Sequence, residues 1–169
     1  LLGIDMGLDD AAFGIEAGNI EIAVAEAAIG AIEAGDGRHR IGLQGRDGAT
    51  TVAGALSLMA LSPIRVFATG GIGGVHREPQ FDESADLAEL SRTPVIVVCA
   101  GAKSILDLSA TMERLESFGV VVVGYRTKEM PGFFFADTGI PLATSVASVD
   151  EIAQLYALQC SLGRQQSIV

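Results

Sequence analysis

Short apolar runs alternate with amphipathic stretches along this chain, and glycines mark most of the joints between them. Runs that are continuously apolar and rich in β-branched residues predict buried strands. The predicted strands are Ile64–Ala68, Val95–Cys99 and Val120–Val123, with Phe133–Phe135 and Leu142–Val146 as two further candidates. Strands that are apolar on both faces indicate a sheet covered by helices on both sides.

Stretches with apolar residues at helical spacing separate these runs. The predicted helices are Asn19–Ala34, Thr50–Leu61, Ser84–Leu90, Ser104–Phe118 and Val149–Leu162. Ser84 suits an N-cap, because a serine hydroxyl accepts a hydrogen bond from the backbone N–H groups that open a helix. The alternation predicts an α/β protein, a three-layer α/β/α sandwich whose central sheet is largely parallel and open to mixed pairing at an edge. We expect residues 1–169 to form a single domain that is an incomplete copy of a larger one.

Composition narrows the classes of partner. The chain has 169 residues, of which 49% are hydrophobic, yet no apolar run is long enough to cross a bilayer. We therefore expect an apolar surface that is covered by oligomerisation or by chain that is absent here. The formal net charge of −10 argues against nucleic acid and anionic membranes as partners, whereas a small anionic ligand remains compatible. Two cysteines, Cys99 and Cys160, form no disulfide framework and favour a reducing, cytosolic setting.

A glycine-rich joint follows the first predicted strand. Four of the five residues of Gly70–Gly74 are glycines, and His76 and Arg77 come directly after them. The joint has neither the Gly-Lys-Ser/Thr of a Walker loop nor the spacing of a dinucleotide fingerprint. Two interpretations stay open, a tightly packed turn and a cradle for a ligand, and the histidine and arginine favour an anionic or polar ligand.

Carboxylates follow this joint. Asp82 and Asp86 lie four residues apart and Glu89 three further on, so a helix starting there would carry them on one side. Acidic residues in a first helical turn stabilise the helix dipole, which is one interpretation. The other is ligation of a hard divalent cation such as Mg²⁺ or Mn²⁺, which needs only one or two carboxylates and keeps several waters.

Lys103 lies between a predicted buried strand and the first turn of a predicted helix. The N-terminus of a helix carries partial positive charge, and burial disfavours an ammonium ion, so both effects would favour the neutral amine. A neutral lysine amine is a nucleophile that forms a Schiff base with a carbonyl carbon. The sequence therefore offers Lys103 as a candidate catalytic residue beside the alternative of a solvated lysine at a loop edge.

Taken together, these motifs resemble one family. The resemblance rests on the strings Phe67–Arg77, Ser84–Leu87 and Cys99–Asp107, with Gly48–Ala53 upstream and Gly119, Gly124-Tyr125, Thr127 and Met130-Pro131 downstream. In this order they are similar to the pseudouridine-5′-phosphate glycosidases, the indigoidine synthase A-like family. The resemblance runs from about Gly45 to Val169.

The resemblance implies a reaction and a set of roles. The family reversibly cleaves the carbon–carbon glycosidic bond of pseudouridine 5′-phosphate, giving uracil and ribose 5-phosphate. By resemblance, Lys103 is the nucleophile that forms an imine with the opened sugar, and Asp82 holds Mn²⁺. The residues that would contact the substrate are Thr51, Val52, His76, Ser84, Ala85 and Asp86. The resemblance also implies a cytoplasmic homotrimer.

The chain departs from the family in its first part. The Glu-Ser-Thr-Ile motif that supplies the family's proton donor is absent, and the dissimilar Gly37–Arg40 region replaces a lysine-bearing substrate motif. Three hypotheses follow: a pseudouridine-5′-phosphate glycosidase, a Schiff-base lyase or aldolase acting on another sugar phosphate, and a binding module without catalysis. All three predict binding of a small molecule.

Overall fold

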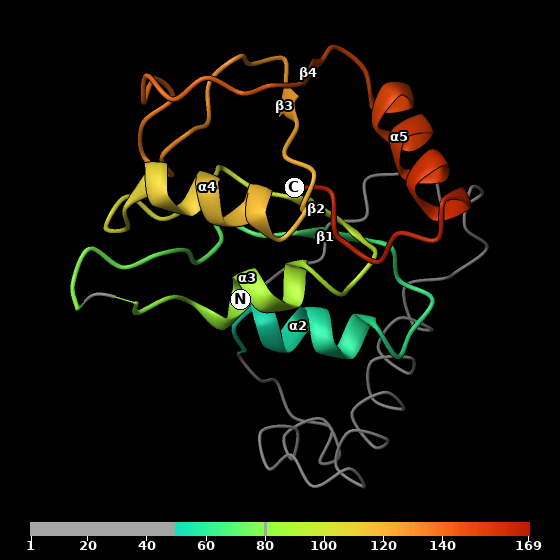
Figure 1. Cartoon of the computed structure of the whole chain (residues 1–169). Coiled ribbons are helices and arrows are strands. Elements are labelled where there is room, and N and C mark those ends of the chain that lie inside the picture. The colour runs from blue at the N-terminus through green and yellow to red at the C-terminus, as the bar shows by residue number, and fades with distance from the viewer. Residues whose placement is uncertain (1–49, 80) are drawn as a thin grey trace, which may run out of the picture.

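The structure is a computed structural model that describes residues 50–79 and 81–169 (Figure 1). The predicted helix Asn19–Ala34 lies outside these residues. In chain order the elements are α2 (Val52–Met59), β1 (Val66–Ala68), α3 (Ala85–Leu90), β2 (Ile96–Val98), α4 (Leu108–Ser117), β3 (Gly124–Tyr125), β4 (Ser145–Val146) and α5 (Val149–Ser161). Helix therefore alternates with strand from α2 to β3, as the apolar pattern predicts, and β4 follows β3 without a helix between them.

The central strands run parallel. β1 pairs with β2 in register, with Val66 opposite Ile96. Near the end of the chain, Ile168 pairs in parallel with Ile96 on one side and with Val121 on the other. These bridges place four segments side by side in the order β1, β2, Ile168, Val121, and β3 and β4 form a second parallel pair.

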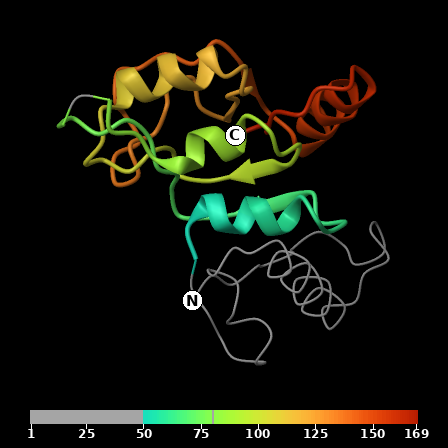
Figure 2. The ribbon, with the colours of Figure 1, turned by 60° about the horizontal axis from the view of Figure 1, so that its bottom comes forward.

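Helices cover both sides of β1 and β2: α4 lies on one side and α2 on the other in both views (Figures 1 and 2), and α3 packs against α2. The α/β class predicted from the sequence is confirmed. The core between the layers is built from apolar side chains of every layer, and its fully buried members include Leu56, Leu87, Leu90 and Leu115. Burial of such side chains stabilises the fold by roughly 1.5–3 kcal/mol each.

Polar caps set where the helices begin. The hydroxyl of Thr51 accepts from Gly54 N–H at the start of α2, and Ser84 caps α3 as predicted. At α5, Ser148 and Glu151 form a reciprocal capping box. Each cap satisfies a backbone N–H that has no partner inside its helix, which is why these helices begin one residue later.

Four predictions of element bounds need correction. α4 begins at Leu108 and not at Ser104, because the Asp107 carboxylate accepts from Ala110 N–H and caps the helix there. Phe133–Phe135 is not a strand, since Phe133 has a φ of 64° that breaks the extended chain. Of Leu142–Val146, only the last two residues form a strand, and Val120–Val123 pairs through an isolated bridge at Val121.

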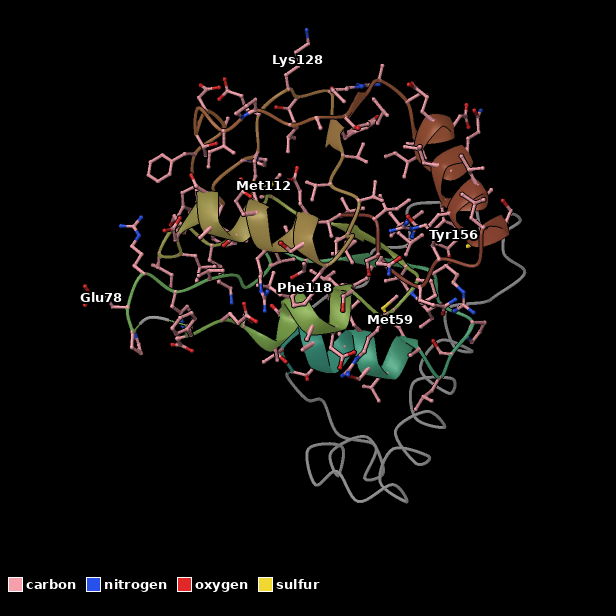
Figure 3. All side chains as sticks on the ribbon, in the orientation of Figure 1. Met59, Glu78, Met112, Phe118, Lys128 and Tyr156 are labelled. Atoms are coloured by element: carbon pink, nitrogen blue, oxygen red, sulfur yellow. The ribbon has the colours of Figure 1, made fainter. Side chains whose placement is uncertain are left out.

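Helix α5 is anchored by one aromatic side chain. The hydroxyl of Tyr156 donates to the carbonyl of Pro94 at 2.8 Å, and Figure 3 shows this side chain between α5 and the rest of the molecule. Burial raises the pKa of Tyr156 to about 12. None of the helices in the described part of the chain is long and apolar enough to cross a membrane.

Candidate functional site

The glycine-rich joint, Gly70–His76, pairs with neighbouring segments through isolated bridges at Ile72 and Val75, and we call it the glycine segment. Its neighbour on one side is the stretch that carries Lys103. Ile72 N–H donates to Gly101 O at 3.0 Å, and Lys103 N–H donates to Ile72 O at 3.1 Å. These bonds make a parallel bridge between Ile72 and Ala102. The two joints that the sequence singled out therefore lie side by side.

The register of this bridge decides where the lysine side chain points. Ile72 and Ala102 are both fully buried in the core. Lys103 directly follows Ala102 and is exposed, so its side chain points away from the core that buries Ala102, and its neighbour across the pairing is Gly73, which follows Ile72. Neighbouring strands lie about 4.8 Å apart, which places the backbone of Lys103 directly beside that of Gly73. Lys103 itself is exposed.

Asp86 joins three segments at the same place. Its side chain is buried, its Oδ1 accepts from Ala53 N–H at 2.8 Å, and its Oδ2 accepts from Gly73 N–H at 2.7 Å. One bond reaches the first turn of α2, and the other reaches the glycine segment. We call this arrangement the Asp86 clamp. It brings the start of α2, the start of α3 and Gly73 together beside Lys103.

Close packing accounts for two of the glycines. A Cβ at Gly73 would stand 2.8 Å from Asp86 Oδ2 and closer still to Ser84 Oγ, and a Cβ at Gly71 would stand 2.5 Å from Phe133 Cδ2. Real Cβ atoms essentially never approach other heavy atoms under 3.0 Å. Of the two interpretations of the joint, the tightly packed segment is the one that the contacts at these positions support.

The far end of the glycine segment carries the His76–Asp82 pair. His76 N–H donates to Asp82 O at 2.9 Å, and the side chains meet at 2.6 Å between Nδ1 and Oδ2. Both side chains are about half exposed. Residues 73 and 76 are three apart, so the pair lies within roughly 10 Å of Gly73 along the backbone.

The His76 and Asp82 side chains offer few ligands for a divalent cation. No group of three or more His, Cys, Asp or Glu side chains gathers for a metal in the residues that the structure describes. Asp82 offers a partly exposed carboxylate, and His76 already contacts one of its oxygens. This donor set fits a hard cation that keeps most of its water ligands, as Mg²⁺ and similar ions do, and it does not fit a fully protein-ligated site.

An ion pair fixes the stretch that bears Asp82. Arg114 of α4 donates from its Nε and a terminal nitrogen to both carboxylate oxygens of Glu83, at 2.7 and 2.8 Å. This hydrogen bonding lowers the pKa of the Glu83 carboxyl and raises the pKa of Arg114. Glu83 also pairs with Val75 of the glycine segment. The pair therefore holds α4 against the segment that carries the candidate metal ligand.

The other predicted contact residues lie at helix starts around the Asp86 clamp. Thr51 is exposed and caps α2, while Val52, the next residue, is buried. Ser84 caps α3 by accepting from Asp86 N–H at 3.2 Å, and Ala85 is exposed. The backbone contacts thus draw the starts of α2 and α3 to Gly73, next to Lys103.

The expected surroundings of the lysine need correction. α4 begins five residues after Lys103, so the side chain does not stand in the first turn of a helix. It is also exposed and not buried by the strand before it. The sequence placed the helix start too early because Ser104, Ile105 and Leu106 fit a helical pattern, whereas Asp107 provides the cap.

A cavity lies elsewhere in the molecule. It measures about 420 Å³ and lies among α4, the apolar stretch after it and the loop before β4. Its lining residues are Met112, Glu116, Val120, Val121, Val122, Pro141, Leu142, Ala143 and Thr144. None of the residues predicted to act on a substrate lines it. The residues predicted from sequence gather instead around the glycine segment.

Sequence reasoning missed the role of Phe133. Its backbone N–H donates to Ala100 O at 2.9 Å, and its ring lies against Gly70 and Gly71. The apolar run of three phenylalanines suggested a strand, and the signal for another conformation was the Pro131-Gly132 pair before it. The Asp86 clamp was also missed, because nothing in the spacing of residues 53, 73 and 86 reveals a shared contact.

Comparison with known proteins identifies the family to which this chain belongs. The family model described as "Indigoidine synthase A like protein" matches residues 12–169, and the chain belongs to this family. The match begins earlier than the resemblance noted from about residue 45. A solved indigoidine synthase A-like protein from Thermotoga maritima superposes with a TM-score of 0.69 and 36% identity, over 75% of this chain and 42% of that one.

Curated relatives carry a more particular name. A protein of Gemmatimonas aurantiaca named pseudouridine-5′-phosphate glycosidase is 61% identical over 74% of this chain and 41% of its own length. One of the same name from Saccharopolyspora erythraea is 42% identical over 98% of this chain and 58% of its own length. The chain thus spans about two fifths of the first of these relatives. The solved prealnumycin C-glycosynthase AlnA, in complex with ribulose 5-phosphate, is 39% identical over 75% of this chain and 43% of that one, with a TM-score of 0.68.

Proposed function

We propose that this chain acts in the reversible cleavage of pseudouridine 5′-phosphate to uracil and ribose 5-phosphate, with Lys103 as the nucleophile. The observation that carries the proposal is the register of Ile72 with Ala102. It makes Lys103 the neighbour of Gly73, where the Asp86 clamp gathers the candidate contact residues. The names of the relatives described above support the proposed reaction, the cleavage of pseudouridine 5′-phosphate.

The chemistry suits an amine. The free amine of Lys103 attacks C1′ of the sugar and the C1′–O4′ bond breaks. The attacking nitrogen gives up one proton, and O4′ takes up a proton in the same step, so the nitrogen regains its lone pair. The nitrogen lone pair then forms an iminium with C1′ as the C1′–C5 bond breaks. The electron pair of the C1′–C5 bond passes to C5 of uracil, and a general acid protonates that carbon. Water hydrolyses the imine and releases ribose 5-phosphate and the free amine. A carbon–carbon glycosidic bond has no leaving oxygen to protonate, so the two-carboxylate mechanism of ordinary glycosidases does not suffice.

A divalent cation, Mn²⁺ by preference, is proposed at Asp82. Such an ion supplies positive charge near an anionic substrate and orders water. Asp82 would hold it through its carboxylate, and His76 positions that carboxylate by hydrogen bonding. Electron paramagnetic resonance of added Mn²⁺ tests this assignment: the bound signal should disappear in Asp82→Asn, and an unchanged signal would refute it.

We propose a homotrimer in the cytoplasm as the working form. Large apolar side chains are exposed in the described residues, among them Phe81, Phe134, Phe135, Leu158 and Leu162. Exposed apolar surface of this kind favours association of copies. Cys99 and Cys160 are both free thiols, which is the usual state in a reducing compartment. Fractionation of source cells tests the location, and recovery outside the cytoplasmic fraction would overturn it.

The chain offers an unusually clean test of the nucleophile. Its only two lysines are Lys103 and Lys128. Figure 3 shows the Lys128 side chain pointing away from the ribbon into solvent. Incubation with ribose 5-phosphate and borohydride should add the reduced sugar phosphate at Lys103, as located by peptide mapping. Lys103→Arg should abolish this label, because a guanidinium does not form the imine, while Lys128→Arg should label like the wild type.

Turnover completes the test. Uracil release from pseudouridine 5′-phosphate in the presence of Mn²⁺ should fall at least about a hundredfold in Lys103→Arg, in keeping with loss of a covalent nucleophile. Labelling that is equal at the two lysines would refute the role of Lys103. Ligand binding without any turnover by the folded wild type would instead favour a non-catalytic binding module.

A second candidate function has one specific observation in its favour. The C-glycosynthase relative is described in complex with ribulose 5-phosphate, so this fold binds a sugar phosphate in a protein other than a named pseudouridine glycosidase. This second function is that of a Schiff-base lyase or aldolase, in which Lys103 still forms the imine but the carbon–carbon bond that breaks or forms does not involve uracil. Borohydride labelling of Lys103 combined with absence of uracil from pseudouridine 5′-phosphate would favour it over the first proposal.

A further inference from the structure

The ring of Phe133 lies against the glycine segment, near the position where Lys103 neighbours it. Its Cδ2 and Cε2 atoms lie 2.5 and 3.0 Å from where a Cβ of Gly71 would stand, so the ring covers the bare backbone there. Gly71 lies two residues before Gly73, the neighbour of Lys103 across the pairing. Two residues of chain span at most about 7 Å of backbone, so the ring covers the segment close to the place where Lys103 adjoins it.

The backbone holds this ring firmly. Phe133 has a φ of 64°, a conformation that costs energy for a bulky residue and persists only when the surroundings enforce it. The surroundings here are the bond from Phe133 N–H to Ala100 O and the antiparallel bridge between Gly101 and Gly132. The ring of Phe134 meets that of Phe133 edge-on, with centroids 4.5 Å apart. The side chain is thus oriented and still partly exposed.

An oriented aromatic ring beside the imine-forming lysine suits one part of the proposed substrate. Ribose 5-phosphate is polar throughout, whereas uracil is planar and has a π-face. Aromatic side chains stack on nucleobases with about 1–3 kcal/mol per base. Resting on the proposed function, we infer that Phe133 is a specificity-determining residue that contacts the planar pyrimidine, while the sugar phosphate does not depend on it.

The experiment separates base from sugar. Phe133→Leu keeps an apolar side chain but removes the plane, Phe133→Tyr keeps the plane, and Phe135→Leu is the matched control at an exposed ring two residues on. Two quantities are measured for each: the KM for uracil in the synthetic direction at saturating ribose 5-phosphate, and the rate of borohydride labelling of Lys103 by ribose 5-phosphate alone.

Phe133→Leu should raise the KM for uracil about tenfold, the equivalent of about 1.4 kcal/mol, with the labelling rate within about twofold of wild type. Phe133→Tyr and Phe135→Leu should leave both quantities within about twofold. Equal loss of labelling and of uracil use in Phe133→Leu would assign the ring a merely structural role and overturn the inference, as would an unchanged KM.

The outcomes also separate this inference from the proposed function. If the wild type uses uracil and Phe133→Leu has the same KM for uracil, only the role of Phe133 is overturned. A wild type that labels at Lys103 but neither uses uracil nor binds it in calorimetry overturns both. Loss of uracil use confined to Phe133→Leu supports both together.

Discussion

At the scale of single residues, the Asp86 carboxylate joins α2, α3 and the glycine segment. Both of its oxygens accept backbone N–H groups, one from Ala53 and one from Gly73. A buried carboxylate is tolerated only when it is hydrogen-bonded, and both bonds are short. The predicted contact of Asp86 with substrate stays a prediction, and any such contact would have to share an oxygen that already holds the backbone.

Asp86→Asn should destabilise the fold. The amide keeps one acceptor but turns an NH₂ group towards a backbone N–H, which leaves a buried donor unsatisfied. Such a loss costs about 1–3 kcal/mol in the free energy of unfolding, measured by urea denaturation. Asp137→Asn, at an exposed loop position, is the control and should unfold like the wild type. A stability of Asp86→Asn equal to that of the control would contradict the clamp.

At the scale of elements, α4 is held to the glycine segment through the Arg114–Glu83 pair. Glu83 directly follows Asp82 in the chain, so the ion pair anchors the backbone next to the candidate metal ligand. The pair is partly exposed, and exposed ion pairs contribute little to overall stability. Its effect should therefore appear in pH dependence more clearly than in total stability.

The pKa of Glu83 in the folded chain is lowered from 4.5, chiefly by hydrogen bonding to Arg114. A lowered folded-state pKa contributes stability above the unfolded-state pKa, and the contribution is lost as pH falls through the folded-state value. The Tm of wild type should therefore exceed that of Glu83→Gln near pH 7, and the gap should close as the pH is taken below 4.5. Glu113→Gln, which removes another exposed carboxylate of α4, is the control. A gap that widens in acid would refute the assignment.

Elements were predictable to different degrees. The helices α2, α3 and α5 and the strands β1 and β2 follow from apolar periodicity and from caps that lie next to them in sequence. The start of α4 was misplaced because propensity favoured helix from Ser104 while a local side-chain bond decided for Asp107. For the candidate site, motifs singled out the residues, whose roles stay predictions, but their meeting in space could not be predicted. It depends on backbone bonds between residues distant in sequence.

At the scale of the whole molecule, the exposed apolar side chains raise the question of assembly. Sedimentation equilibrium should give a mass three times the 17.4 kDa of one chain. The physical reason is that association removes apolar surface from water at about 25 cal/mol per Å². A mass of one chain at every concentration tested would contradict the proposed trimer. A dimer mass would contradict it equally.

The pairing of Ile72 with Ala102 has a consequence for how reliably a functional fold forms. A shift of one residue between these segments would drive the polar end of Lys103 into the core and expose Ala102 to water. Burying an unpaired polar group costs more than burying a methyl group gains. The misaligned chain is therefore unstable and does not accumulate. Molecules that fold at all should present the amine in one orientation, so a preparation is expected to be uniform in its reactive groups.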